Sequence, residues 1–160
     1  MRALIRTLSP DYANYGGILQ AWALQRTLRD LGIDSVVDAS ARTPPSAAKY
    51  VKSCVRAARR LLPSRMKLIP GDHEIYRNQP LLGFVEQNMV TTRLFPPVGV
   101  KPRRSVLRSF DAFVVGSDQV WRSDYADVPS FMLDFLGEDK RPRVAYAASM
   151  GALELNRWRS

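Results

Sequence analysis

The first forty residues combine two short apolar stretches, a glycine turn and one amphipathic stretch. Residues 2–8 are mostly apolar, Pro10 breaks the pattern, and Gly16 and Gly17 stand side by side. After them, apolar residues recur every three or four positions, as on one face of a helix, and Gly32 is placed to end it. Strand, helix and a second strand at 35–38 fall within about 40 residues, which predicts a βαβ unit and a Rossmann-like α/β fold with a parallel sheet flanked by helices. The predicted helix face comprises Gly17, Ala21, Leu24, Leu28 and Leu31, with Ile18 and Trp22 beside it.

The rest of the chain repeats this arrangement less regularly. A short apolar piece at 131–135 separates the last two predicted strands. We expect one Rossmann-like domain over 1–151, a basic insert at 41–70 within it, and a tail at 152–160. The remaining predicted elements are an irregular connection at 64–80, short helices at 81–90 and 103–109, and buried strands at 110–115 and 143–148.

The chain has one cysteine, Cys54, and one histidine, His73. A disulfide framework and a Cys/His metal site both need more such residues, so neither is expected. A Ser-His-Asp triad would have to use His73, which lies in a polar stretch, so a triad of this kind is not expected. No apolar run approaches the roughly 20 residues of a membrane helix, and the N-terminus does not have the pattern of a secretory signal. We therefore expect a cytoplasmic protein.

The net charge of +9 is concentrated in residues 41–70, which hold eight Lys and Arg and no Asp or Glu. Residues 47–62 alternate apolar and basic faces, which predicts an amphipathic helix. The simplest interpretation is a helix packed on the sheet with a solvated face. A second is weak peripheral contact with an anionic lipid surface, at the inner face of the membrane. Nucleic acid is not expected, because no aromatic residues alternate with the charges. The basic residues of this helix are Lys49, Lys52, Arg56, Arg59 and Arg60.

Three polar or glycine-containing clusters stand at the carboxyl ends of predicted strands, at residues 14–17, 116–119 and 149–151. Open parallel sheets bind ligands at that edge. We therefore predict that the three clusters gather along one rim. The first amides of the helix that follows the glycines suit an anionic group.

Each cluster also has a simpler interpretation. Gly16 and Gly17 form only a tight turn in that view, and Ser117 or Asp118 caps a following helix. The aromatic residues near the clusters are expected in the core rather than as a ligand platform. These aromatic residues are Trp22 and Trp121.

A dinucleotide site has to be weighed, because Asp38 ends the second strand about 20 residues after the glycines, as the fingerprint requires. The required G-x-G-x-x-G is absent, since Gly16 and Gly17 are followed by Ile18. The phosphate-loop pattern with Lys and Ser or Thr is absent too. Nicotinamide binding and nucleotide hydrolysis are therefore set aside.

Four motifs occur in order along the chain: NYGGxLQAxAL at 14–24, DAFVVGSDQVW at 111–121, FxLDF at 131–135 and VAYAASMG at 144–151. Together they resemble the polysaccharide pyruvyl transferase family, in its N-terminal portion. The resemblance spans residues 3–151, within which 41–80 are not diagnostic.

The resemblance implies a fold similar to the GT-B glycosyltransferases, with two Rossmann-like domains facing a cleft. It implies transfer of a pyruvyl group from phosphoenolpyruvate to sugar hydroxyls of cell-wall polymers or exopolysaccharides, with ketal formation and phosphate release. Phosphoenolpyruvate is the donor substrate, and no cofactor is expected. Such a donor needs amides, Arg or Lys to hold its charge. The reaction also needs an acid that protonates the methylene carbon of phosphoenolpyruvate and a base that accepts the proton of the sugar hydroxyl.

The resemblance also suggests roles for the clusters. Asp118 is the candidate catalytic residue, for proton transfer or for orienting a sugar hydroxyl. Ser117 and Gln119 are its hydrogen-bonding neighbours. The expected substrate-binding residues are Asn14, Tyr15, Gly16, Gly17, Gln20, Gly116, Ser117, Gln119 and Ser149.

The chain departs from the resemblance in its length, because members of the family run to about twice as many residues. The part without a counterpart is the second domain, where the basic and histidine residues associated with phosphoenolpyruvate are expected. The first expectation is therefore a half-enzyme, which is either a truncated gene product or one chain whose partner domain is encoded separately. The alternatives are a non-catalytic carbohydrate- or anion-binding module, and half of a GT-B-like glycosyltransferase. Self-association through exposed apolar surface is a further expectation.

Overall fold

The computed structural model describes residues 1–8, 14–40, 72–96, 101–123 and 126–151. Its centre is a sheet of five strands in the order β3-β2-β1-β4-β5, with every neighbouring pair parallel. This confirms the predicted α/β class and parallel sheet. The strands are β1 (Arg2–Arg6), β2 (Asp34–Asp38), β3 (Thr91–Thr92), β4 (Ala112–Asp118) and β5 (Arg143–Ala148).

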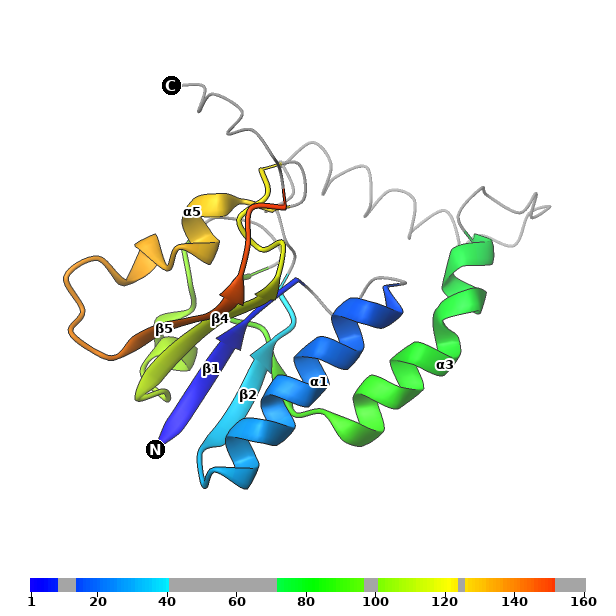
Figure 1. Cartoon of the computed structure of the whole chain (residues 1–160), viewed down its shortest axis with the longest axis horizontal. Coiled ribbons are helices and arrows are strands. Elements are labelled where there is room, and N and C mark those ends of the chain that lie inside the picture. Colours follow the sequence, from blue (N-terminus) through cyan, green and yellow to red (C-terminus); the bar gives the residue numbers. More distant parts are fainter. Residues whose placement is uncertain (9–13, 41–71, 97–100, 124–125, 152–160) are drawn as a thin grey trace, which may run out of the picture.

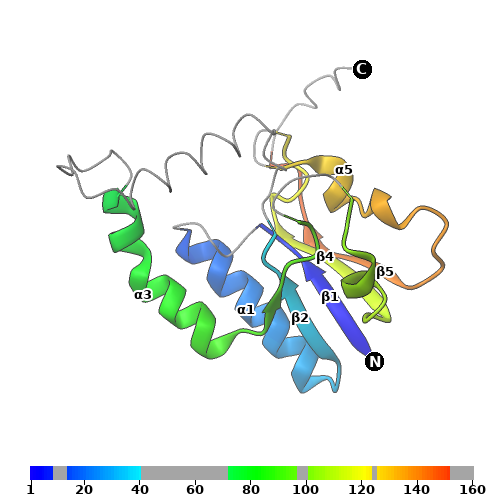
Figure 2. The ribbon, with the colours of Figure 1, turned by 180° about the vertical axis from the view of Figure 1, so that it is seen from behind.

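Helices lie on both sides of this sheet (Figure 1, and from behind in Figure 2). Helices α1 and α3 lie on one face and α5 lies on the other. In the part of the chain that the structure describes, no helix is long and apolar enough to cross a membrane. The helices are α1 (Tyr15–Asp30), α3 (Asp72–Asn88), α4 (Arg104–Leu107), α5 (Val128–Phe131) and a 3₁₀ turn, η1 (Asp134–Leu136).

The core is split by the sheet into two layers because successive strand residues point to opposite faces. On the α1 side, Ile5 and Val114 pack against Ile18, Ala21 and the second half of α3. On the other side, alternate residues of the same strands pack against the segments around α5 and η1. That second layer includes Leu4, Val36, Phe95, Phe113, Val115, Phe131 and Leu133.

Helix α1 confirms the predicted helix and its stop signal. The amide of Gly32 donates to the carbonyl of Arg29 at 2.8 Å, and that of Ile33 donates to Leu28 at 2.9 Å. These are the paired bonds of a Schellman cap, and Gly32 has the left-handed φ of +78° that such a cap needs. The predicted helix face is wrong at its last position, because Leu31 lies in the cap and is 70% exposed.

The prediction for residues 64–80 is wrong over 72–80, which form the first half of α3. Pro80 lies inside that helix, although a proline removes one helical hydrogen bond and usually ends a helix. Leu81, Val85 and Met89 follow it at helical spacing and are buried against α1. Tertiary packing therefore outweighs the local penalty of the proline. The two-residue strand β3, which pairs with β2, was not predicted.

Strand β5 has the predicted bounds, but the prediction that it is buried is wrong. It occupies the edge of the sheet, and within the described residues it pairs only with β4. Val144 is 50% exposed and Tyr146 is 56% exposed. Strand β4 runs on to Asp118, so residues 116–118 belong to the strand rather than following it. The predicted basic helix at 47–62 and the tail at 152–160 lie outside the described residues.

Candidate functional site at the carboxyl ends of the strands

Strand β4 ends in a backbone conformation that requires glycine at position 116. Gly116 has φ +114°, and the peptide bond from Gly116 to Ser117 is cis. A Cβ at Gly116 would lie 2.1 Å from the carbonyl oxygen of Tyr146 on β5. No side chain fits there, because real Cβ atoms do not approach a backbone oxygen so closely. The neighbouring strand therefore packs directly on the backbone that leads to Asp118.

Asp118 is held by its own neighbours at the end of β4. Its φ is +83°, in the left-handed region that residues with a Cβ seldom adopt. Its Oδ1 accepts a hydrogen bond from the backbone N–H of Gln119 at 2.7 Å. A turn, not an α-helix, follows directly, so the interpretation of Asp118 as a helix cap is wrong. The half-buried carboxylate instead closes the turn at the strand end.

The third cluster packs onto this turn. The N–H of Ser149 donates to the carbonyl of Asp118 at 3.0 Å, and that of Trp121 donates to the carbonyl of Ser149 at 3.1 Å. Gly151 has φ +61°, and a Cβ there would lie 2.3 Å from Cδ of Gln119. The second and third clusters therefore form one surface, as the sequence predicts.

The first cluster stands at the start of α1, where Asn14 is the N-cap. The Asn14 Oδ1 accepts from the N–H of Gly17 at 3.2 Å. A Cβ at Gly17 would lie 3.2 Å from the Asn14 Nδ2, so the glycine lets the asparagine fold over the helix end. The prediction that this amide faces an anion is therefore wrong for Gly17, because the Asn14 side chain already binds it. Tyr15 is 60% exposed beside it.

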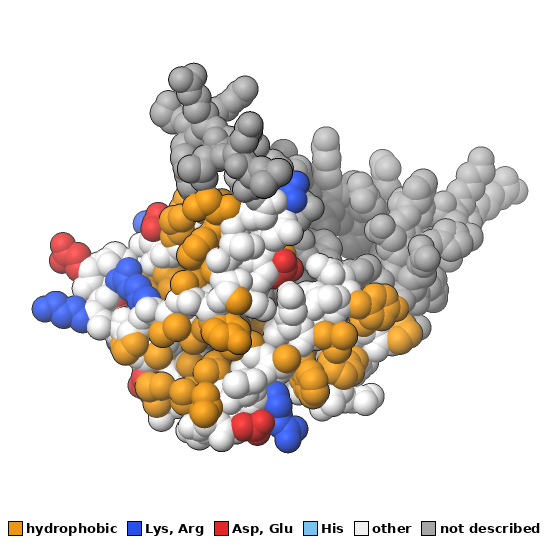
Figure 3. Space-filling view, viewed as in Figure 1, with side chains coloured by type: hydrophobic (Ala, Val, Ile, Leu, Met, Phe, Trp, Pro, Cys, Tyr) orange, Lys and Arg blue, Asp and Glu red, His pale blue; other side chains and the backbone are white. Residues whose placement is uncertain are grey.

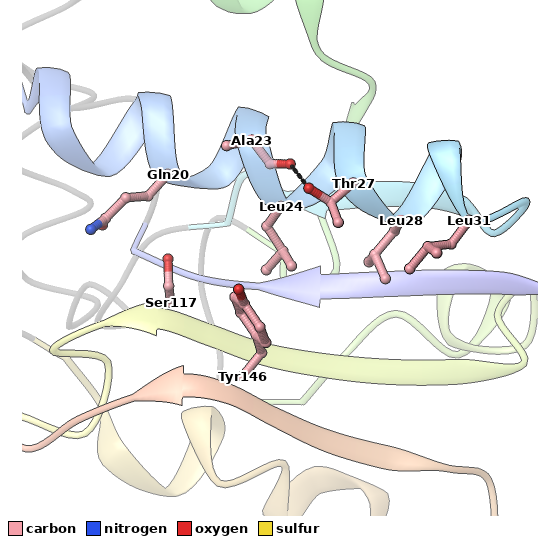
Figure 4. A pocket seen from close by; sticks show the side chains of 8 residues that line it. All are labelled: Gln20, Ala23, Leu24, Thr27, Leu28, Leu31, Ser117 and Tyr146. Atoms are coloured by element: carbon pink, nitrogen blue, oxygen red, sulfur yellow. Dashed lines mark hydrogen bonds between the residues drawn. The ribbon is translucent and has the colours of Figure 1, made fainter.

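A groove of about 300 Å³ lies beside the second cluster, of which Ser117 is a lining residue. It runs between α1 and the ends of β4 and β5, and we call it the α1–β5 groove. Figure 4 shows Ser117 and Tyr146 pointing from the sheet toward α1, which contributes Gln20 and Leu24. Gln20 and Ser117 are predicted site residues, whereas Tyr146 is not. The lining residues are Gln20, Ala23, Leu24, Thr27, Leu28, Leu31, Ser117 and Tyr146.

Arg122 is a second rim residue that sequence reasoning missed. Its Nη1 donates to the Oε1 of Gln119 at 3.1 Å. The side chain of Gln119 thus lies between this guanidinium and the backbone of Gly151. A basic residue three positions after Gln119, in a turn, is the sequence signal that was available.

Asp38, the acidic residue of the rejected dinucleotide pattern, has a structural role. It is completely buried, and its Oδ2 accepts from Nη1 of Arg6 at 2.5 Å. The guanidinium of Arg6 also donates to the Ser130 Oγ at 2.9 Å and lies between the rings of Phe95 and Phe131. Burial lowers the pKa of Arg6, and the Asp38 charge opposes that shift. Asp38 is therefore committed to an ion pair, which supports setting the dinucleotide site aside.

Trp22 and Trp121 are half-buried and partnered within the fold. Trp22 packs edge-to-face on Phe84 with ring centroids 5.9 Å apart. The indole N–H of Trp121 donates to the carbonyl of Phe131 at 3.2 Å. Both fit the structural interpretation rather than a ligand platform. Among the described residues, no group of three or more His, Cys, Asp or Glu side chains is arranged to hold a metal ion.

The parallel sheet and the polar rim define an α/β protein whose candidate site lies at the carboxyl ends of its strands. The sequence profile of the polysaccharide pyruvyl transferase family matches residues 14–160. The chain therefore belongs to the polysaccharide pyruvyl transferase family, as its motifs predict. No curated protein and no solved structure matches it.

Proposed function

We propose that this chain takes part in transfer of a pyruvyl group from phosphoenolpyruvate to a sugar of a cell-wall polymer or exopolysaccharide. The family match over residues 14–160 carries the proposal. In this reaction, two hydroxyls of one sugar add to carbon 2 of the donor, and the bond from that carbon to the phosphate oxygen breaks. One hydroxyl proton goes to the methylene carbon, which becomes a methyl group. The other leaves with inorganic phosphate.

We assign to Asp118 the transfer of a hydroxyl proton or the orientation of the attacking hydroxyl. Three observations support this assignment: its place at the carboxyl end of a central strand, its positive φ and its partly exposed carboxylate. Non-glycine residues in sparsely populated backbone regions are concentrated at functional sites. The N–H of Gln119 fixes one carboxylate oxygen, which leaves the other side of the carboxylate for a substrate.

The donor carries several negative charges, so its site needs cations and hydrogen-bond donors. Arg122, which Gln119 holds at the rim, supplies positive charge on this side of the site. We propose that a second domain faces the rim, in a GT-B-like arrangement, and contributes the remaining cationic groups. Gly16 and Ser149 are exposed along the rim, which supports a site that is open on the side where the second domain would lie. One wall alone does not exclude water from the reacting groups, so the isolated chain should have little activity.

The test is phosphate release from phosphoenolpyruvate with galactosyl and mannosyl acceptors. We expect release when the chain is combined with a second-domain polypeptide encoded downstream, and loss of that release in Asp118→Asn. Full activity of the isolated chain would contradict the need for a second domain. No release under either condition would contradict the transferase proposal, and would favour a binding module.

A further inference from the structure

We propose that the rim end of the α1–β5 groove binds the neutral sugar ring of the acceptor, with Tyr146 as its stacking platform. The inference rests on the proposed function, which supplies a sugar as substrate. The site consists of Gln20 and Leu24 on α1, Ser117 on β4 and Tyr146 on β5. The volume of about 300 Å³ lies at the lower end of the range for small-molecule sites, which suits one sugar unit.

The charge of the groove distinguishes between the two substrates. None of the described residues that line it is charged. A multiply anionic donor such as phosphoenolpyruvate would lose its hydration there without gaining a cation, which is unfavourable. A neutral polyol has no such penalty. The groove therefore suits the neutral acceptor rather than the anionic donor.

The polar groups at the rim end are of the kind that recognises hydroxyls. The Gln20 amide and the Ser117 hydroxyl form no hydrogen bond within the part of the chain that the structure describes. Each of these groups can both donate and accept, as can a sugar hydroxyl. Thr27 differs, because its Oγ1 already donates to the carbonyl of Ala23 at 2.9 Å. Hydrogen bonding is therefore available at the rim end rather than farther along α1.

The apolar side chains complete this picture. Tyr146 is 56% exposed on an edge strand, and Figure 4 shows its ring directed toward α1 across from Leu24. An aromatic ring with a polar tip can cover the C–H face of a pyranose and bind a hydroxyl with its O–H. Gly116 makes this possible, since a side chain there would displace the backbone of Tyr146. Ser117, which lines the groove, directly precedes Asp118 in the chain.

The same face also carries exposed apolar surface that extends away from the rim. Figure 3 shows apolar side chains spread across it, and Leu31 and Val144 are 70% and 50% exposed. A helix of another polypeptide, or a second copy of this chain, is the competing occupant of the groove. The two occupants differ in a measurable way, because a helix needs the whole ridge from Gln20 to Leu31, whereas a sugar needs only the rim end.

The experiment is an NMR titration of the ¹⁵N-labelled chain with methyl α-D-galactopyranoside and methyl α-D-mannopyranoside. We expect at least one of them to shift the amide signals of Ser117 and Tyr146. Tyr146→Ala should weaken binding by about tenfold, and Tyr146→Phe by no more than about twofold, because the ring remains. Val144→Ala is the matched control, on the same strand and similarly exposed, and should bind as the wild type does.

Three results would overturn the inference: no binding of either sugar, wild-type affinity in Tyr146→Ala, or equal losses in Tyr146→Ala and Val144→Ala. A dimer that dissociates in Leu31→Ala would assign the groove to a second copy, which also overturns it. Phosphate release from phosphoenolpyruvate separates this inference from the proposed function. Release with an unchanged acceptor KM in Tyr146→Ala contradicts the groove and leaves the transferase intact. Sugar binding that depends on Tyr146, with no release even when the second-domain polypeptide is present, supports the groove and contradicts the transferase.

Discussion

Replacing Gly116 with alanine tests the account of how β5 shapes the rim. The new Cβ would lie 2.1 Å from the carbonyl oxygen of Tyr146, at a φ of +114°. Forcing extra atoms into a packed region costs about 1–3 kcal/mol, and a left-handed conformation with a Cβ costs about 1–2 kcal/mol more. We therefore expect Gly116→Ala to lower the free energy of unfolding by about 3 kcal/mol. For a chain of this length, that corresponds to a fall in Tm of about 6–12 °C.

Gly83→Ala is the matched control for this substitution. Gly83 lies inside α3, and nothing is within 4 Å of the Cβ that alanine would add. The same chemical change should therefore raise stability by up to about 1 kcal/mol, since alanine favours helix more than glycine does. Urea denaturation of the three proteins measures both effects. A loss below about 0.5 kcal/mol in Gly116→Ala would refute the claim that β5 packs on a bare backbone.

Three further substitutions test the rest of the fold. Gln25→Ala removes a buried amide whose Nε2 bonds two carbonyls at 2.9 and 2.8 Å, so urea denaturation should show a loss of about 2–3 kcal/mol. Asp38→Asn leaves Arg6 buried without its ion partner, so it should lower the free energy of unfolding by about 3–5 kcal/mol in the same assay. The double variant Arg6→Met, Asp38→Asn should lose less stability than the sum of the losses in the two single variants. A hydrogen bond from Arg141 lowers the pKa of Asp139 to about 2 from 3.8. The carboxylate therefore contributes stability above pH 3.8 that is lost as the pH falls toward 2. An acid titration followed by circular dichroism should show a shallower transition in Asp139→Asn.

Features that depend on nearby residues could be predicted from the sequence. The helix α1 follows from the spacing of its apolar residues, and its end follows from Gly32 and Ile33, whose backbone bonds span only the last turn. The gathering of residues 116–119 and 149–151 follows from a rule of topology, because the ends of parallel strands share one edge. These predictions do not require knowledge of the tertiary packing.

Features that depend on distant partners could not be predicted. The exposure of β5 is set by its edge position, which its apolar sequence does not reveal. The helix that contains Pro80 is stabilised by packing on α1, so the rule that a proline ends a helix fails there. Arg6 looks like an exposed strand residue until Asp38, 32 positions away, provides the partner that lets it be buried.

The candidate site shows the same division. Ser117, Asp118 and Gln119 stand out because they directly follow an apolar run. Tyr146 was missed because the apolar sequence of β5 does not tell that this strand lies at the edge of the sheet. Arg122 was missed because its role depends on a contact with the Gln119 side chain, which no spacing rule describes.

The most direct test of the central claim is to follow the carbon that the reaction transfers. Phosphoenolpyruvate labelled with ¹³C at carbon 2 would be incubated with the chain, the proposed second-domain polypeptide and a galactosyl or mannosyl acceptor. The products would be analysed by ¹³C NMR. The account predicts a labelled ketal carbon attached to the sugar, which is absent with Asp118→Asn. Unchanged donor, or labelled pyruvate with no sugar adduct, would contradict the assignment of this rim to pyruvyl transfer.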